Sequence, residues 1–207
     1  MKKVKKIVTL TFMGIMMLVL MVGCEPWVEV DGVKWAIYNV GDSGKFVDDP
    51  TKGLFYQWGR DIGWDKNGNH YPNSPVIQWD TTKAGGDWNN GKAVCPKGWR
   101  LPNISEIQKL IASGSFEGKL NGVEGTFFIG KENKRLFFPF GTLNPTDGSP
   151  AHTKTYGNIW GSYEKDENNH WQIYNMGNHH GTAGWSTGAN RANGHYVRCV
   201  CEEDTNK

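Results

Sequence analysis

Aromatic rings and glycines, rather than aliphatic side chains, are the material from which this chain must build its core. The sequence holds 27 glycines and 10 tryptophans in 207 residues, and aliphatic residues are few after residue 23. Such a chain packs large rings between tight turns, so a bundle of Leu-rich helices is not expected. The same abundance of aromatic residues argues against disorder.

The first 23 residues predict an export signal. Residues 1–6 contain four lysines and no acidic residue, and residues 7–22 carry no charge. This uncharged run is shorter than the roughly 20 apolar residues of a membrane-spanning helix, and it fits the apolar region of a signal peptide. It ends in Met21-Val22-Gly23-Cys24, which resembles the lipobox of bacterial lipoproteins. We therefore expect lipidation of Cys24; an ordinary secretory signal with an incidental cysteine is the alternative.

Removal of this signal changes the net charge of the chain, and the charge limits which classes of partner are expected. The formal charge of +2 includes the four lysines of the signal, so the mature chain without them carries a formal charge of −2. No Lys/Arg-rich run occurs after residue 6, so no nucleic-acid partner is expected. The remaining 184 residues suit one domain. The expected division is a signal peptide at 1–23, a short tether at 24–31 and a folded domain at 32–203, lipid-anchored in the bacterial envelope, at the outer membrane.

Three cysteines remain for the folded domain, and an exported protein can form disulfides. Cys199 and Cys201 are two residues apart, so on a strand they share a face and cannot easily pair with each other. Cys95 is therefore expected to bridge one of the two. The alternative to a disulfide is a metal site formed by Cys199 and Cys201, but no further His or Cys lies at a suitable ligand spacing.

One segment has the pattern of a helix. Asn103 can cap it, Glu106 stands three residues later as in a capping box, and Gly114 ends it. The long stretch 60–92 shows no sustained period and predicts an irregular loop. Short strands are expected elsewhere, which together give an α+β fold. The expected strands cover residues 33–40, 54–59, 125–130, 136–140, 158–163, 170–176 and 195–201.

Five short landmarks follow one another along the chain: GVKWA at 32–36, GLFYQWG at 53–59, CPKGWRLP at 95–102, WGS at 160–162 and YVRCV at 196–200. Their order resembles one family, the Fibrobacter succinogenes major paralogous domain of Bacteroidetes surface lipoproteins. The resemblance implies a C-type-lectin-like α+β fold in which the N- and C-terminal strands pair. It would place Trp35 near Val197 and pair Cys95 with Cys199. An unpaired Cys201 departs from the family pattern.

The leading functional hypothesis from the sequence is recognition of a glycan or polysaccharide. Sugars stack on exposed indole rings, and five tryptophans lie in Asn/Asp/Gly-rich segments outside the family landmarks. Packing of the long loops by these rings is the alternative for each. A surface protein is the second ligand class, since loop aromatics also serve protein interfaces. The candidate ligand-binding residues are Trp64, Trp79, Trp88, Trp171 and Trp185.

No catalytic residue, metal site or cofactor is predicted. The segment 65–69 superficially resembles a calcium loop but lacks the closing glutamate, so a turn is favoured. The adjacent pair His179-His180, with His170 and His195 elsewhere, has no ligand spacing. No nucleophile motif, glycine-rich phosphate loop or carboxylate pair appears, so the protein is not expected to be an enzyme.

The lipobox yields a direct prediction. We expect the mature protein to begin at Cys24 and to carry the mass of its acyl chains, measured by intact-mass spectrometry of the membrane fraction. The variant Cys24→Ala should lose that mass and leave the membrane. A mature chain without acyl mass on Cys24 would contradict the lipid anchor but would still be consistent with export.

Overall fold

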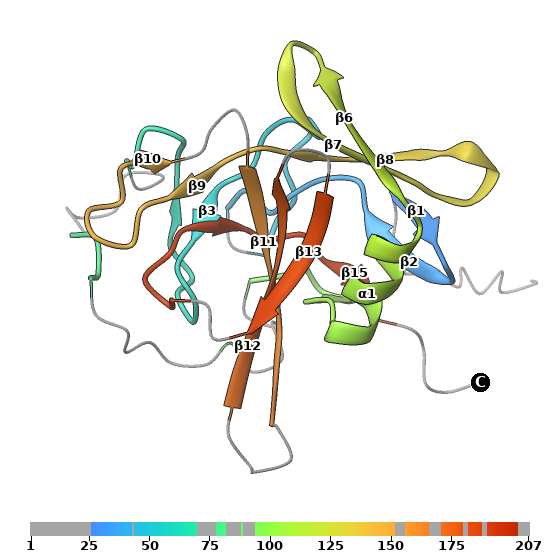
Figure 1. The fold of residues 1–207 in the computed structure, drawn as a ribbon. Helices are drawn as coiled ribbons and strands as arrows, with labels where there is room; N and C mark the ends of the chain where they lie inside the picture. The colour runs from blue at the N-terminus through green and yellow to red at the C-terminus, as the bar shows by residue number, and fades with distance from the viewer. Residues whose placement is uncertain are drawn as a thin grey trace, which may run out of the picture.

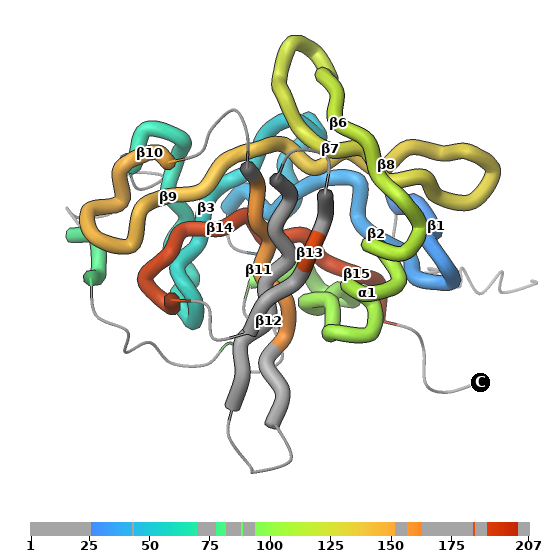
Figure 2. The backbone as a smooth tube through the Cα atoms, in the orientation of Figure 1, coloured from blue at the N-terminus to red at the C-terminus, as the bar shows by residue number. Residues whose placement is uncertain are grey.

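The computed structural model describes residues 26–42, 44–69, 78–81, 88, 94–151, 156–165, 171–179, 182–187 and 190–202. Only the backbone is described for residues 156, 163–165, 171–179 and 182–187. Figure 2 traces the backbone, coloured from the N-terminus to the C-terminus. The expected signal peptide and Cys24 lie outside the described residues.

Mostly antiparallel sheets and a single α-helix form the described part of the fold, which is α+β as expected (Figure 1); in the largest sheet β11 and β14 pair in parallel. In sheet order, the first sheet is β1 (Trp27–Val30), β2 (Val33–Ala36), β15 (Val200–Cys201) and β5 (Trp99–Arg100). The largest is β13 (Thr182–Thr187), β12 (Trp171–His179), β11 (Tyr156–Lys165), β14 (His195–Tyr196), β3 (Phe55–Tyr56) and β4 (Gly63–Trp64). The others are β6 (Ser115–Leu120), β7 (Val123–Ile129) and β8 (Arg135–Pro139), then β10 (Pro150–Ala151) and β9 (Thr142–Leu143). Among the described helices, α1 (Ile104–Ala112) and the short 3₁₀ turn Lys131–Asn133, none could span a bilayer.

The two ends of the domain pair with each other, as the family resemblance implies. Strand β2 lies between β1 and β15, and the blue and red strands meet in Figure 1. Trp35 pairs with Val200 in this ladder, whereas Val197 accepts a hydrogen bond from the amide of Val40 at 2.9 Å. The expected tether at 24–31 is corrected here, because β1 lies within that range and forms a hairpin with β2. The ordered sheet therefore begins at Trp27.

The predicted helix is confirmed together with its cap. The Asn103 side chain accepts a hydrogen bond from the Glu106 amide at 2.9 Å, and the Glu106 carboxylate accepts one from the Asn103 amide at 2.8 Å. Arg100 donates to both oxygens of the same carboxylate, at 2.7 and 2.6 Å. This fork ties β5 to the start of α1, and the helix buries Ile107 and Leu110.

The tryptophans of the family landmarks are core residues. Trp35, Trp58, Trp99 and Trp160 are all buried. The Trp160 indole donates to the Tyr56 carbonyl, and its ring packs against Trp58 with centroids 5.5 Å apart. Large rings therefore make up much of the core, together with aliphatic residues such as Val30 and Leu136.

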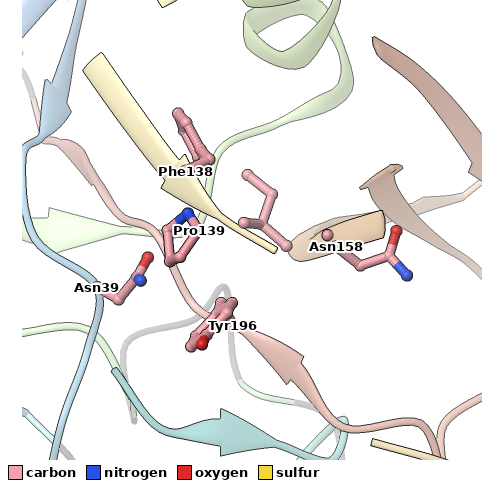
Figure 3. A pocket seen from close by; sticks show the side chains of 7 residues that line it. Asn39, Phe138, Pro139, Asn158 and Tyr196 are labelled. Carbon is pink, nitrogen blue, oxygen red and sulfur yellow. The ribbon is translucent and has the colours of Figure 1, made fainter. Parts of the chain in front are cut away.

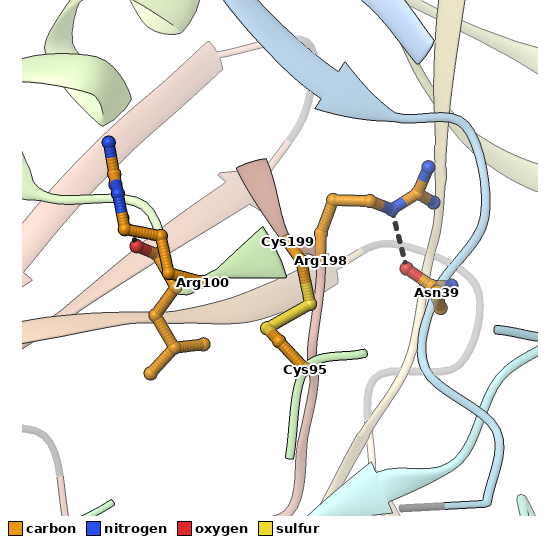
Figure 4. Close-up of a disulfide and its surroundings, with 6 residues drawn as sticks. Asn39, Cys95, Arg100, Arg198 and Cys199 are labelled. Carbon is orange, nitrogen blue, oxygen red and sulfur yellow. Dashed lines mark hydrogen bonds between the residues drawn. A yellow bond between two sulfur atoms is a disulfide. The ribbon is translucent and has the colours of Figure 1, made fainter. Parts of the chain in front are cut away.

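Arg198 is fully buried and joins three parts of the chain. Its guanidinium donates to the Asn39 side chain at 2.8 Å, to the Ala36 carbonyl at 3.0 Å and to the Phe137 carbonyl at 2.9 Å. Figure 4 shows it directed at Asn39. It also lies over the Phe138 ring, 4.6 Å from the centroid. Burial lowers the pKa of Arg198 to about 9, so the group stays charged at neutral pH. Neutral oxygen acceptors and an aromatic ring stabilise the buried charge. These contacts hold β2 and β8 against the C-terminal segment.

The predicted disulfide between Cys95 and Cys199 is confirmed (Figure 4). The two residues are 104 positions apart, and their Cα atoms lie 6.1 Å apart. Closing a loop of about 100 residues contributes about 4.7 kcal/mol in the chain-entropy model. The expectation of an unpaired Cys201 is wrong, because none of the described cysteines is a free thiol and Cys201 is disulfide-bonded.

The Arg198 contacts predict a large stability cost for their removal. The variant Arg198→Met leaves three buried acceptors without a donor, and we expect the free energy of unfolding to fall by about 3 kcal/mol or more. Urea denaturation of the full chain in detergent measures this change. The matched control Arg135→Met alters an exposed arginine and should stay within about 0.5 kcal/mol of the original chain. Equal stability of the two variants would contradict a structural role for Arg198.

Candidate functional site

Three of the five candidate sugar-stacking tryptophans are packed inside the protein. Trp64, Trp79 and Trp88 are 5%, 8% and 2% exposed. Trp64 and Trp79 pack edge to face with centroids 4.9 Å apart, and Trp88 packs at the same distance against Trp58. The indole of Trp88 donates to the Arg60 carbonyl at 2.8 Å. We therefore correct their interpretation as exposed platforms, because the rings that pack the loops together have no open face for a ligand.

The other two candidates are placed only through their backbone. Trp171 pairs with Lys165 at the start of β12, and Trp185 of β13 pairs with Met176. Their side chains lie outside what the structure describes. These two remain candidates on sequence grounds alone.

The segment 65–69 forms the turn that the sequence favoured over a calcium loop. One oxygen of the Asp65 carboxylate accepts hydrogen bonds from the amides of Asn67 and Asn69, at 2.8 and 2.9 Å. The Asp65 amide donates to the Asn69 carbonyl at 2.7 Å. The carboxylate thus organises its own backbone, as Asp does in tight turns.

His195 is a core residue that the sequence placed among scattered histidines. Its Nδ1 lies 2.9 Å from the Thr142 hydroxyl, and its ring packs against Trp160 with centroids 4.3 Å apart. Burial lowers the pKa of His195 to about 3, so the ring is neutral at physiological pH. His170 and His180 lie outside the described residues, and only the backbone of His179 is described. Within the described residues no three His, Cys, Asp or Glu side chains gather as a metal site requires.

A hollow between β8, β11 and β14 is too narrow to hold a water molecule (Figure 3). Asn39 and Asn158 contribute its polar atoms, but the Asn39 amide is already engaged, donating to the Lys52 carbonyl and accepting from Arg198. We interpret the hollow as a packing defect of the core. Its lining residues are Asn39, Phe138, Pro139, Gly157, Asn158, Ile159 and Tyr196.

The sheet β6-β7-β8 has two different faces. Phe128, Leu136 and Phe138 point inward and belong to the main core. On the opposite face, three phenylalanines stand in one cross-strand row, Phe116 beside Phe127 and Phe127 beside Phe137. The rings of the first pair stack 5.2 Å apart, and those of the second pair lie 4.8 Å apart. This row runs from a buried ring on β8 to an exposed ring on β6.

The exposed end of this row is the clearest apolar surface that the structure describes. Phe116 is 40% exposed and Val123 is 36% exposed, and they are the large apolar side chains in the described residues that face solvent. Both belong to the β6–β7 hairpin, which projects from the body of the domain in Figure 1. Arg135 lies beside Phe116, 5.5 Å from the ring centroid. We define the hairpin surface as Phe116, Leu120, Val123 and Arg135.

Sequence reasoning did not find this hairpin, although a signal for it was present. Asn121-Gly122 joins β6 to β7, and both residues have positive φ, 50° and 81°. A two-residue turn with positive φ at both positions favours Asn followed by Gly, and this dipeptide between apolar residues predicts a hairpin. Asp31-Gly32 does the same between β1 and β2, with φ of 45° and 79°.

Comparison with known proteins adds no relative. No protein-family model matches the chain, no curated protein matches it and no solved structure matches it.

The buried His195 predicts a pH-dependent stability. The unfolded state binds a proton near the ordinary pKa of about 6.5, whereas the folded state resists it until the pH approaches 3. The contribution of the neutral His195 ring to stability should therefore be complete above pH 6.5. The free energy of unfolding should fall as the pH drops from 6.5 toward 3. Urea denaturation of the chain and of His195→Gln at pH 7 and pH 4.5 measures this; the loss should be smaller in the variant. Parallel losses in both proteins would contradict a neutral buried histidine.

Proposed function

We propose that this chain is a non-catalytic recognition protein of the bacterial envelope, anchored by lipid on Cys24 and folded as a C-type-lectin-like domain. The chain has four cysteines and Cys95 pairs with Cys199, so acylation of Cys24 and a disulfide at Cys201 exclude each other within one chain, and the proposal concerns the acylated form. The proposal rests on the export signal, on the order of landmarks from GVKWA to YVRCV and on the absence of a catalytic motif in the sequence. The pairing of β2 with β15 and the Cys95–Cys199 disulfide agree with what the family resemblance implies.

The exposed apolar hairpin makes a protein the favoured ligand. An apolar side chain left in water costs solvation free energy, and a cluster of such side chains beside an arginine is typical of protein interfaces. Phe116 presents a ring supported from behind by Phe127, with Arg135 at its edge. A rigid aromatic anchor of this kind supplies much of the binding energy in protein complexes. The exposed Phe116 ring is the observation that favours a protein over a glycan as the ligand.

Glycan binding, which the sequence placed first, loses most of its support. Its argument requires exposed indoles, and the described ones at 64, 79 and 88 are buried. Trp171 and Trp185 keep the hypothesis testable. A protein partner therefore takes the first place, as an adhesin or surface-assembly subunit requires.

Site-specific photo-cross-linking tests the proposal. A photoreactive residue is placed at Val123 in the full chain, in the cells that produce it, and a second one at exposed Lys66 serves as the control position. We expect a protein adduct from position 123 that is absent from position 66 and is lost in the Phe116→Ser variant. The variant removes the exposed ring, and its melting temperature should stay close to that of the original chain because that ring is already partly in water.

A glycan and polysaccharide array with the same protein provides the opposing outcome. Binding on the array that is lost in Trp171→Ala or Trp185→Ala and unchanged in Phe116→Ser would overturn protein recognition in favour of glycan recognition. Equal amounts of adduct from positions 123 and 66, with no effect of Phe116→Ser, would contradict binding at the hairpin surface.

A further inference from the structure

The described part of the chain begins two residues after the cysteine that is proposed to carry lipid. The Pro26 carbonyl accepts a hydrogen bond from the Ile37 amide at 3.3 Å, and β1 follows at once with Trp27. Two residues of fully extended chain span at most about 7 Å. The polar layer on one side of a bilayer is about 5 to 8 Å thick. In the acylated form, the surface around Pro26 therefore cannot lie clear of the lipid headgroups.

Strand β1 has two faces, and one of them is turned away from the main core. Val28 and Val30 point into that core, whereas Trp27 and Glu29 alternate to the other side and are half-buried. The 3₁₀ turn between β7 and β8 lies beside the strand, and its Lys131 Nζ is 3.6 Å from the Glu29 carboxylate. In Figure 1, β1 and this turn lie on the same side of the domain. The start of β1 and the turn therefore form one continuous surface.

The side chains of this surface suit a boundary between lipid and water. The Lys34 ammonium lies over the Trp27 ring, 5.2 Å from its centroid. An indole with one apolar and one wet side is favoured at the level of lipid headgroups. Lys131 and Lys134 are exposed, and Lys134 lies 3.6 Å from Glu132. Long lysine stems reach lipid phosphates while their apolar part stays on the protein. We define the anchor face as Pro26, Trp27, Lys34, Lys131 and Lys134.

We propose that the anchor face rests on the surface of the bilayer that holds the acyl chains of Cys24. The tether is no longer than the headgroup layer is thick, so it imposes the contact. Trp27 then lies at the level of the headgroups, and the lysines meet lipid phosphates. The inference rests on the proposed function in one respect, because it requires acylation of Cys24. Phe116 and Val123 of the hairpin surface are not part of the anchor face.

The length of the tether also decides between a membrane and a protein as the occupant of this face. A long tether lets a domain turn freely above the bilayer, and any of its faces can then meet a partner. A tether of two residues keeps the same face beside the headgroups at all times. A protein would have to displace lipid that is held there by the covalent anchor.

Photo-cross-linking to lipid tests the contact. The acylated full chain is purified in detergent and reconstituted into vesicles of phosphatidylethanolamine and phosphatidylglycerol. A photoreactive residue replaces Lys131, which is far from Cys24 in the sequence, and in a matched control it replaces Lys66 in the turn after β4. Both lysines are exposed, so neither replacement removes a core contact. We expect a phospholipid adduct from position 131 and none from position 66, detected by mass spectrometry of the peptides.

A longer tether tests the cause of the contact. About 20 Gly and Ser residues are inserted between Glu25 and Pro26, which gives a flexible tether with an average span of about 25 Å. The lipid adduct from position 131 should fall about tenfold or more, because effective concentration falls with roughly the −3/2 power of tether length. The insertion precedes β1, so the melting temperature should stay that of the original chain.

The remaining outcomes separate this inference from the proposed function. Equal lipid adducts from positions 131 and 66 overturn it, and so does an adduct from position 131 that is unchanged by the longer tether. If Cys24 carries acyl mass and position 131 gives no lipid adduct, the inference falls and the lipid anchor stands. If Cys24 carries no acyl mass, the anchor and the inference fall together.

Discussion

The buried guanidinium of Arg198 is the interaction on which the arrangement of this domain most depends. A charge removed from water is costly unless its donors are satisfied, and here the acceptors come from Ala36, Asn39 and Phe137. These acceptors belong to the N-terminal region and to β8, and the adjacent Cys199 binds Cys95. Through Arg198 and Cys199, the C-terminal segment is thus held to the end of β2, to Cys95 and to the β6-β7-β8 sheet.

The aromatic core explains where the exposed apolar side chains lie in the described part of the fold. The domain uses its tryptophans to fill the space between short strands, and Trp58 with Trp88 and Trp64 with Trp79 are pairs of this kind. Rings used in this way are lost to ligands. Among the described residues, the exposed large apolar side chains are on the β6–β7 hairpin, which extends beyond the core, so the outer end of its phenylalanine row stays in water.

Local sequence signals were sufficient where local contacts decide the structure. The cap of α1 needs only Asn103 and Glu106, three residues apart, and both were identified. Several expected strands were found, although β2 and β3 are shorter than expected and the expected strand 195–201 is divided into β14 and β15. Strand β4 lies in the stretch expected to be an irregular loop, and β13 was not expected. The hairpins β1–β2 and β6–β7 were missed because their turn dipeptides, Asp31-Gly32 and Asn121-Gly122, were not used as turn signals. The paired termini and the Cys95–Cys199 disulfide came from a family resemblance, since no local rule specifies contacts across such distances.

The sequence by itself determined the aromatic content of the core and the capped helix α1, and it predicts export and lipidation, because each of these depends on neighbouring residues or on residue type. Only the tertiary structure decided which aromatic rings are buried. A tryptophan in a polar segment has the same sequence signature whether it packs a loop or meets a ligand, and the difference lies in what folds over it.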